Sequence, residues 1–340
     1  MEQKAILEKA ILGIDVAKLT LSVWLVTADV PIERGRHQSF ANTPRGYERL
    51  SAWLHNQKVE SVWACLEPTS TYHEALAEYL ADAGHRVSVA NPRHVHRFAE
   101  GINTQLKTDK QDAYLLARYC AHCQPATWSA PSKAQRELRN MVRQWQSLKE
   151  DYQRYLNHLE PLPASEKRLR ATYQRLAKAV EKEIARIYHE IERFLDEHPE
   201  LQRLRKLFET VDGVGPVTSI TIVAEMGDMS NFRDPRQAVA YAGLVPRIRQ
   251  SGTSINGRGG ISKRGNKRVR TALYMPALSA KRFDHDLRAF AQRLHDKGKP
   301  VKVVITAVMR KLLHIFWGIA KSGQPRKIVV INAKNIMATT

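Results

Sequence analysis

Four acidic residues stand where acids are unusual or where their spacing suits joint chemistry. Asp15 interrupts an apolar run at residues 11–16, and strand interiors rarely carry aspartate because a buried charge is costly without a partner or a metal. Glu67 closes a second apolar run, in CLEPTSTY. Asp109 and Asp112 are three residues apart in a helical pattern and so share a helix face. Either one alone also fits the ordinary role of an acid in the first turn of a helix.

Four carboxylates suit a pair of divalent metal ions. Mg²⁺ prefers oxygen ligands, and two ions about 4 Å apart clamp the attacking and leaving oxygens of a phosphodiester. Carboxylates packed closely would repel one another without such ions. We therefore predict that Asp15, Glu67, Asp109 and Asp112 bind Mg²⁺, with Mn²⁺ as a possible substitute, and act in catalysis.

A strongly basic segment is the second chemical feature. Residues 235–283 contain eleven lysines and arginines and no acid, which predicts a phosphate-binding surface with a flexible loop at Gly252–Gly265. The basic residues expected to contact nucleic acid are Arg247, Arg249, Arg258, Lys263, Arg264, Lys267, Arg268 and Arg270.

Ser251 lies within this basic segment, between Arg249 and Gly252. A serine attacks phosphate only if its proton is removed and the charge of its target is neutralised. The arginines could do the second, but the loop has no histidine to do the first. From these residues alone, an ordinary loop serine remains the alternative.

A short glycine motif, Gly213-Val214-Gly215, separates two expected helices. It resembles a helix-hairpin-helix turn, in which Gly213 and Gly215 would let the backbone approach a phosphate. A plain turn between helices is an equally good reading of so short a motif.

The first 130 residues alternate between strand and helix patterns. The expected strands are Ile11–Val16, Leu21–Thr27, Gln38–Asn42, Ser61–Leu66 and Arg86–Ala90. The expected helices are Pro44–Asn56, with Thr43 as N-cap, and Tyr72–Ala83, ending at Gly84. Three strands followed by helix, strand, helix and strand is the order of an α/β ribonuclease-H-like sheet, which would place Asp15 and Glu67 on neighbouring strands.

Residues 131–205 carry apolar residues at heptad spacing. The first series is Leu138, Trp145, Tyr152 and Leu159, with Met141, Leu148 and Tyr155 offset by three; the second is Tyr173, Val180, Ile187 and Phe194, with Ala177, Ile184 and Ile191. Pro161 and Pro163 separate them. Two such helices must fold back on each other, dimerise, or both, with a hairpin packed on its own domain as the simpler alternative.

The composition indicates an intracellular protein with a polyanionic partner. Lys and Arg number 54 against 34 Asp and Glu, a net charge of +20, which favours nucleic acid over a membrane surface. Charges interrupt the apolar stretch at Val301–Ala320, and the N-terminus lacks a signal-peptide pattern, so we expect a cytoplasmic location. Cys120 and Cys123 have a metal-like spacing, but with no second cysteine pair they are expected to be free thiols.

Several ordered motifs resemble one known family. They are GIDVAK, LEPTSTY, KTDKQDAYLLARY, GVGPVTS, AYAGLVP, SGTS and ALYMPAL, spread from about residue 11 to 320. Together they resemble the DEDD insertion-sequence transposases of the IS-one-ten family, which include the Piv DNA invertase and bridge-RNA-guided recombinases.

This resemblance implies three domains: a RuvC-like nuclease domain (1–130), a coiled coil or helical hairpin (131–205) and a mostly α C-terminal transposase domain (206–340). It assigns the four acids to Asp15, Glu67, Asp109 and Asp112, and the nucleophile, which forms a 5′-phosphoserine with DNA, to Ser251. The implied partners are donor and target DNA, a bridge RNA and further copies of the chain, as a dimer or tetramer, on the bacterial nucleoid.

Two other function classes remain open. A RuvC-like nuclease or junction resolvase would need the acids but would use water instead of Ser251. A nucleic-acid-binding scaffold would need neither, and the intact set of acids argues against it. The sequence also departs from its relatives at Gln250, where an acid can precede the serine, and in the glycine-rich insert Gly257–Gly260.

Overall fold

The computed structural model describes residues 10–28, 30–68, 71–102, 108–251 and 255–326. The chain forms two compact units, Met1–Pro131 and Ser132–Thr340. The helical segment expected as a separate domain at 131–205 therefore belongs to the same unit as the C-terminal helices. The reason is that apolar residues at its base, such as Leu138 and Trp145, join the core of that unit.

The first unit is built on a five-stranded sheet of order β3-β2-β1-β4-β5. Its strands are β1 (Ala10–Val16), β2 (Thr20–Val26), β3 (Arg36–Ala41), β4 (Val62–Leu66) and β5 (Arg86–Val89). The β1–β2 and β2–β3 pairs are antiparallel, whereas β1–β4 and β4–β5 are parallel. This is the strand order expected of a ribonuclease-H-like sheet, and it places β1 and β4 side by side at its centre.

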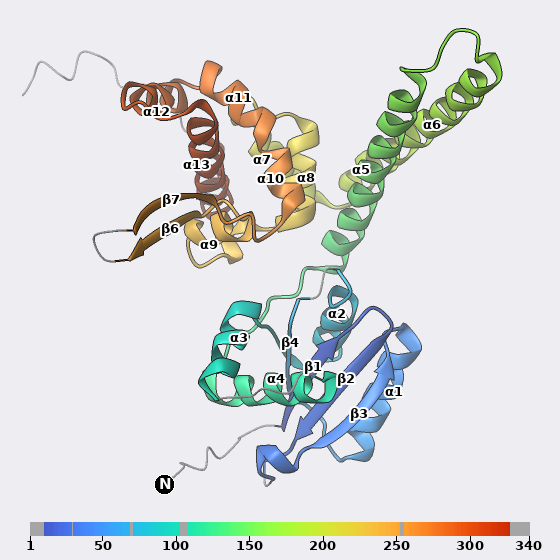
Figure 1. Ribbon diagram of the computed structural model, residues 1–340, viewed down its shortest axis with the longest axis vertical. Coiled ribbons are helices and arrows are strands. Elements are labelled where there is room, and N and C mark those ends of the chain that lie inside the picture. The colour runs from blue at the N-terminus through green and yellow to red at the C-terminus, as the bar shows by residue number, and fades with distance from the viewer. Residues whose placement is uncertain (1–9, 29, 69–70, 103–107, 252–254, 327–340) are drawn as a thin grey trace, which may run out of the picture. The chain divides into compact units, whose positions relative to one another are not determined.

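Helices cover both faces of this sheet (Figure 1). The helices are α1 (Pro44–Asn56), α2 (Glu74–Asp82), α3 (Pro92–Gly101) and α4 (Asp109–Cys123), with a short 3-10 helix η1 (Ile32–Arg34). Leu12 and Ile14 of β1 pack in one core with α1 and α2, whereas Ile11 packs in another with α3 and α4. Alternate residues of a strand face opposite sides of a sheet, so the odd-numbered residues of β1 face α4.

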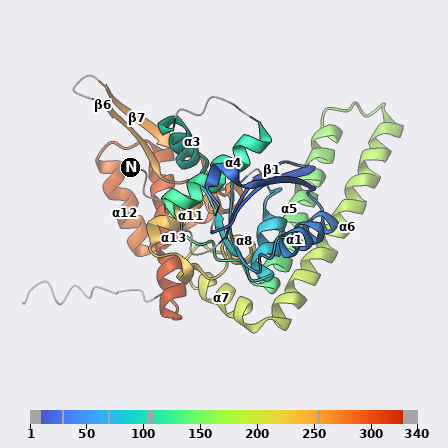
Figure 2. The same ribbon diagram turned by 90° about the horizontal axis from the view of Figure 1, so that it is seen from below.

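The second unit begins with a pair of long helices, α5 (Lys133–Leu159) and α6 (Lys167–Glu197), which lie side by side in Figures 1 and 2. We call them the arm. Trp145 packs in one core with Ile187 and Ile191, so the heptad stripes meet within one chain. The outer heptad residues, including Tyr152 and Tyr173, are only half-buried.

The rest of the second unit is mostly helical. Its elements are α7 (Pro199–Glu209), α8 (Pro216–Met226), η2 (Met229–Asn231), α9 (Pro235–Tyr241), β6 (Pro246–Ser251), β7 (Ile255–Ile261), α10 (Lys267–Ala272), α11 (Tyr274–Phe283), α12 (His285–Asp296) and α13 (Val301–Ser322). Helix α13 is long and apolar enough to span a membrane by composition alone. One face of the helix, which includes Leu312, Leu313 and Phe316, is buried in the core and accounts for its apolar character, whereas Val301 and Val303 are exposed.

Candidate functional site

Strand register brings Asp15 and Glu67 together in the first unit. Ile14 pairs with Leu66 in the parallel β1–β4 ladder, so Asp15 and Glu67 follow at the next position of the same register. Both residues are half-buried. Asp15 lies two residues after Gly13 and therefore on the face of the sheet that α4 covers.

The start of α4 carries the other two acids. Thr108 caps this helix by accepting a hydrogen bond from the Gln111 amide at 3.2 Å, which sets the helix start at Asp109. Asp109 is exposed and Asp112 is half-buried, both in the first turn. The structure thus places the pair where the sequence predicts it.

A close backbone contact holds α4 against β1. A Cβ atom on Gly13 would lie 2.1 Å from the carbonyl oxygen of Ala113 and 2.4 Å from the amide nitrogen of Ala117. Only glycine lets the helix come so near, because backbone atoms cannot move aside as a flexible side chain can. Ala113 follows Asp112 directly, so the contact at Gly13 keeps the first turn of α4 near the strand that carries Asp15.

The four acids lie on three elements, namely β1, the end of β4 and the first turn of α4. Among the residues that the structure describes, no three Asp, Glu, His or Cys side chains are grouped closely enough to hold an ion. The donor set nevertheless suits a hard divalent cation, since carboxylates on β1, the end of β4 and the first turn of α4 belong to one face of the sheet. Metal ligation by these residues stays a prediction.

A histidine that the sequence did not single out contacts the β2 partner of Asp15. Ser22 is the β2 partner of Asp15, and its hydroxyl oxygen is 2.9 Å from Nε2 of His37 on β3. Burial, followed by the charge of Lys110, lowers the pKa of His37. Only the strand pairing reveals His37, because the sequence around it carries no distinctive motif.

Ser251 is the last residue of β6 and pairs with Ile255 of β7. The competing hydroxyl residues Thr253 and Ser254 lie outside the described residues. The expectation of a flexible loop across Gly252–Gly265 is wrong for Ile255–Ile261, which form β7. The glycines there do not prevent an antiparallel ladder, because its hydrogen bonds come from the backbone and β6 supplies the partner.

Exposed cations gather where the hairpin of β6 and β7 joins α10. Lys263, Arg264, Lys267 and Arg268 are all exposed there. Arg270 differs, because it is half-buried and donates a hydrogen bond from Nη1 to the Ala242 carbonyl at 3.0 Å, so it supports the fold. Of the remaining predicted residues, Arg247 is exposed next to Pro246, and Arg249 and Arg258 belong to β6 and β7.

The two glycines of the GVG motif have different surroundings. Gly213 has φ +84°, and a Cβ there would lie 2.7 Å from the Ala280 amide nitrogen and from Ser279 Cβ. It is therefore needed for the packing of the turn against α11. Gly215 caps α8 and has nothing within 4 Å of a built Cβ, so of the two only Gly215 leaves room for a ligand at the start of that helix.

The cysteines divide by burial. Cys65 and Cys120 are fully buried, and a hydrogen bond between them, followed by burial, raises the pKa of the Cys120 thiol. Cys123 is exposed at the end of α4. Cys120 therefore interacts with Cys65 in the core and does not form a metal-ligand pair with the exposed Cys123.

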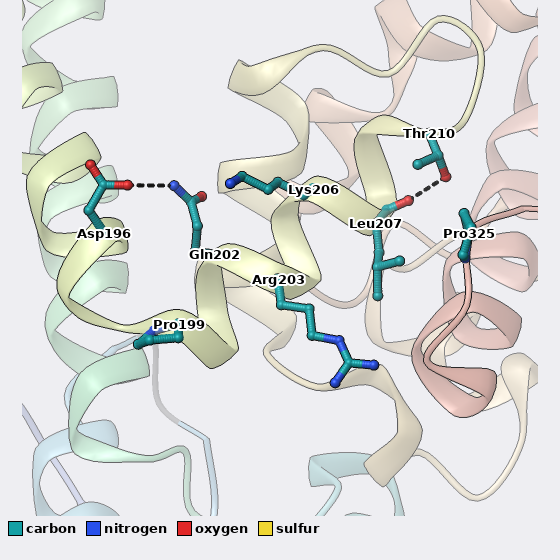
Figure 3. A pocket seen from close by; sticks show the side chains of 8 residues that line it. All are labelled: Asp196, Pro199, Gln202, Arg203, Lys206, Leu207, Thr210 and Pro325. Carbon is teal, nitrogen blue, oxygen red and sulfur yellow. Dashed lines mark hydrogen bonds between the residues drawn. The ribbon is translucent and has the colours of Figure 1, made fainter.

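The second unit also has an open pocket of about 580 Å³, shown in Figure 3. It is lined by Asp196, Pro199, Gln202, Arg203, Lys206, Leu207, Thr210 and Pro325. Asp196 accepts a hydrogen bond from Gln202 at 2.8 Å at one side. The pocket contains neither the acids nor Ser251, so it is not where the predicted strand cleavage would occur.

Comparison with known proteins gives two family matches. A family described as "Transposase", of the DEDD type of IS110 elements, matches residues 12–162. A second, "Transposase IS116/IS110/IS902 family", matches residues 205–292. The first spans the strands and helix that carry all four acids, and the second spans the hairpin with Ser251.

The chain is similar to whole proteins as well. It is 32% identical over 323 residues to the "Pilin gene-inverting protein" of Moraxella bovis, covering 94% of this chain and 98% of that one. It is 26% identical to a "Putative transposase" of Sinorhizobium fredii, covering 93% and 90%. These matches at nearly full length on both sides, together with the two family matches, show that the chain belongs to the IS110 family of transposases.

Proposed function

We propose that this transposase cuts and rejoins donor and target DNA through a covalent link between Ser251 and a DNA 5′-phosphate. The observation that carries the proposal is the position of Ser251 at the end of β6, in a hairpin whose base presents four exposed cations. A DEDD-type domain in the same chain indicates use of a divalent metal. The relative that inverts a pilin gene supports a reaction in which strands are rejoined as well as cut.

The proposed step is an exchange of phosphodiester bonds. The Ser251 oxygen forms a bond to phosphorus, the bond from phosphorus to the 3′ oxygen breaks, and the 3′ oxygen leaves with a proton. The serine proton passes to a carboxylate or to water, and Arg249, two residues before Ser251 in the same strand, would offset the charge that develops on the phosphate. Mg²⁺ bound by the four acids would supply Lewis-acid activation. Attack by the new 3′-hydroxyl of the other DNA reverses the step, so no external energy source is needed.

The deciding experiment is to trap the intermediate. In a substrate nicked close to the cleavage site, the short fragment that carries the new 3′-hydroxyl diffuses away after cleavage. Religation is then impossible, so the covalent adduct accumulates and is seen as protein-bound DNA on a denaturing gel. A resolvase-type nuclease, the alternative function, would release free 5′-phosphate ends and leave no adduct.

We further propose that a guide RNA selects the DNA and that the cations at the hairpin base hold backbone phosphates. Binding that relies on phosphate contacts weakens steeply with salt, by about tenfold or more between 50 and 200 mM. Base pairing with RNA would then carry the sequence choice.

Lys263→Ala and Arg264→Ala test this division of labour. Each should weaken binding of all DNA sequences alike and lower the salt slope by about one. Lys297→Ala, an exposed cation after α12, serves as the control and should change neither. The measurement is fluorescence anisotropy with several DNA sequences over a salt series. A changed order of preference among those sequences would mean that these residues read bases.

The arm is proposed to join copies of the chain. Leu169 and Leu176 are seven residues apart on α6, and their side chains are 49% and 38% exposed. They therefore lie at heptad spacing outside the contact between α5 and α6 and are available to a second copy. Trp145, in contrast, is used within the chain.

Leu169→Asp combined with Leu176→Asp should therefore lower the molar mass of the assembly measured by light scattering and leave the helix content unchanged. Trp145→Asp is the contrasting variant, because a charge at a buried position should destabilise the arm itself by roughly 3–5 kcal/mol. An unchanged oligomer after the double leucine substitution would contradict the proposed interface.

A further inference from the structure

Glu225, a residue without any predicted role, is a buried charge at the end of α8. Its side chain has no exposed surface in the structure. Such a carboxylate is retained only where partners compensate for its loss of water. The partners of Glu225 come from two separate parts of the second unit.

The first partner is the arm. Arg143 of α5 donates to both carboxylate oxygens, from Nε to Oε1 at 2.7 Å and from Nη2 to Oε2 at 2.9 Å. A bidentate arginine fixes both distance and orientation, which a single hydrogen bond does not. Glu225 is thereby joined rigidly to the arm near its base.

The second partner is the base of the β6–β7 hairpin. Asn266 donates from Nδ2 to Oε2 of Glu225 at 2.7 Å. The other side-chain atom of Asn266, Oδ1, accepts from the amides of Arg268 and Val269 and so caps α10. Arg268 adds a longer ion pair, 4.0 Å from Oε1. One carboxylate thus holds the arm and the hairpin base at once.

The hairpin base has further backbone bonds that make it sensitive to Asn266. The Asn266 amide donates to the Tyr241 carbonyl at 2.6 Å, and the Lys263 amide donates to the Gly243 carbonyl at 3.0 Å. Tyr241 in turn donates from its hydroxyl to the backbone carbonyl of Glu225 at 2.9 Å. Glu225 is therefore connected to the segment that follows β7 in two ways, through the Asn266 side chain and through Tyr241.

The charge state of Glu225 fits this role. Burial alone would raise its pKa, but the hydrogen bonds and charge of Arg143, the hydrogen bond of Asn266 and the charge of Arg268 outweigh burial and lower the pKa. The carboxylate is therefore ionised at neutral pH, and both sets of partners share the same two oxygens.

We propose that Glu225 is a positioning residue that couples the arm to the hairpin carrying Ser251. Its effect on the reaction rests on the proposed function, whereas the coupling itself does not. Through this carboxylate, the placement of α5 sets the placement of Asn266, and with it the base of β7. Where arms of two copies meet, the same connection transmits their pairing to the serine hairpin.

The test compares two changes on α5 that remove contacts with α8. Arg143→Gln removes the bidentate bond to Glu225. Gln146→Ala removes the hydrogen bond from Gln146 Nε2 to Thr221 Oγ1 at 3.1 Å, which belongs to the same helix pair but has no connection to Asn266. Amide hydrogen exchange is followed at Ser262, Lys263 and Asn266, and the stability of each variant is measured by thermal unfolding.

Arg143→Gln should speed exchange at these three amides by about tenfold relative to Gln146→Ala, as expected for loss of a charge-assisted bond. Asn266→Ser keeps a good N-cap but cannot reach Glu225, so it should give the same increase at Ser262 and Lys263, and the double variant should add little more. Arg143→Lys, which keeps the charge without the fork, should restore part of the protection and serves in place of Arg143→Gln if that variant does not fold.

The functional readout is the adduct formed by the full chain on nicked DNA. The rate at saturating DNA should fall by about tenfold in Arg143→Gln with the DNA affinity changed less than twofold, because a positioning defect affects the step after binding. Equal exchange in Arg143→Gln and Gln146→Ala, or an unchanged rate despite faster exchange, would overturn the proposal. Absence of an adduct in the unmodified protein would count against the serine reaction, and the exchange comparison would still decide the coupling.

Discussion

Ser251→Ala should abolish the covalent protein–DNA adduct and strand rejoining while DNA binding stays within about twofold of the original. Removing a catalytic nucleophile costs several orders of magnitude in rate, whereas one hydroxyl contributes little to a large charged interface. The measurement is adduct formation on nicked substrate, with the labelled peptide identified by mass spectrometry. Ser251→Cys should retain at most a trace of adduct formation, because sulfur is nucleophilic but the longer C–S bond places it differently.

Thr253→Ala and Ser254→Ala are the matched controls, since each removes a neighbouring hydroxyl from the same segment. Both should still form the adduct. A nucleotide attached to Thr253 or Ser254 would move the nucleophile by a few residues. Normal cleavage by Ser251→Ala, with free 5′-phosphate ends, would instead identify water as the nucleophile and favour the resolvase-type function.

Asp15→Asn and Glu67→Gln should each lower Mg²⁺-dependent strand cleavage by orders of magnitude. Both substitutions nearly keep the size of the side chain but remove the charge that attracts a divalent cation. The thermal stability of the apo chain is measured for the same variants, so that a loss of cleavage is separated from a loss of folding. Cleavage is measured across a Mg²⁺ titration and unfolding by calorimetry.

Glu48→Gln is a suitable control, because Glu48 is exposed on α1, and α1 packs on the face of the sheet opposite α4. It should cleave normally at every Mg²⁺ concentration. Full cleavage in a chelator, or normal cleavage by Asp15→Asn, would show that the four acids do not bind a catalytic metal.

The strands of the first unit, α1 and α2 could be predicted closely from the sequence because their signals are local, whereas α3 was not predicted. Strand patterns predicted all five strands within two residues at each end. Thr43 caps the start of α1 and Gly84 follows the end of α2, as the sequence predicts. The strand order predicted that β1 and β4 are neighbours, and the pairing of Ile14 with Leu66 gives the register that places Asp15 level with Glu67.

The rest of the candidate site could not be predicted, for reasons that differ between residues. The glycine-rich stretch before Ile261 lacks the side-chain alternation by which strands are recognised, so β7 was expected to be loop. Glu225 and Arg143 are 82 residues apart, and His37 reaches Ser22 only through the pairing of β2 and β3. Contacts of this kind depend on tertiary packing and leave no periodic trace in a single sequence.

The separation of the two cores has a thermodynamic consequence. Among the described residues, the cores of the first unit take members only up to Trp128, and the core of the second begins at Ala134. We expect a chain with two separate cores to unfold in more than one step, and a single free energy of unfolding then does not describe it. A destabilising change at Gly13 would affect the unit that carries the four acids, and one at Glu225 would affect the unit that carries Ser251.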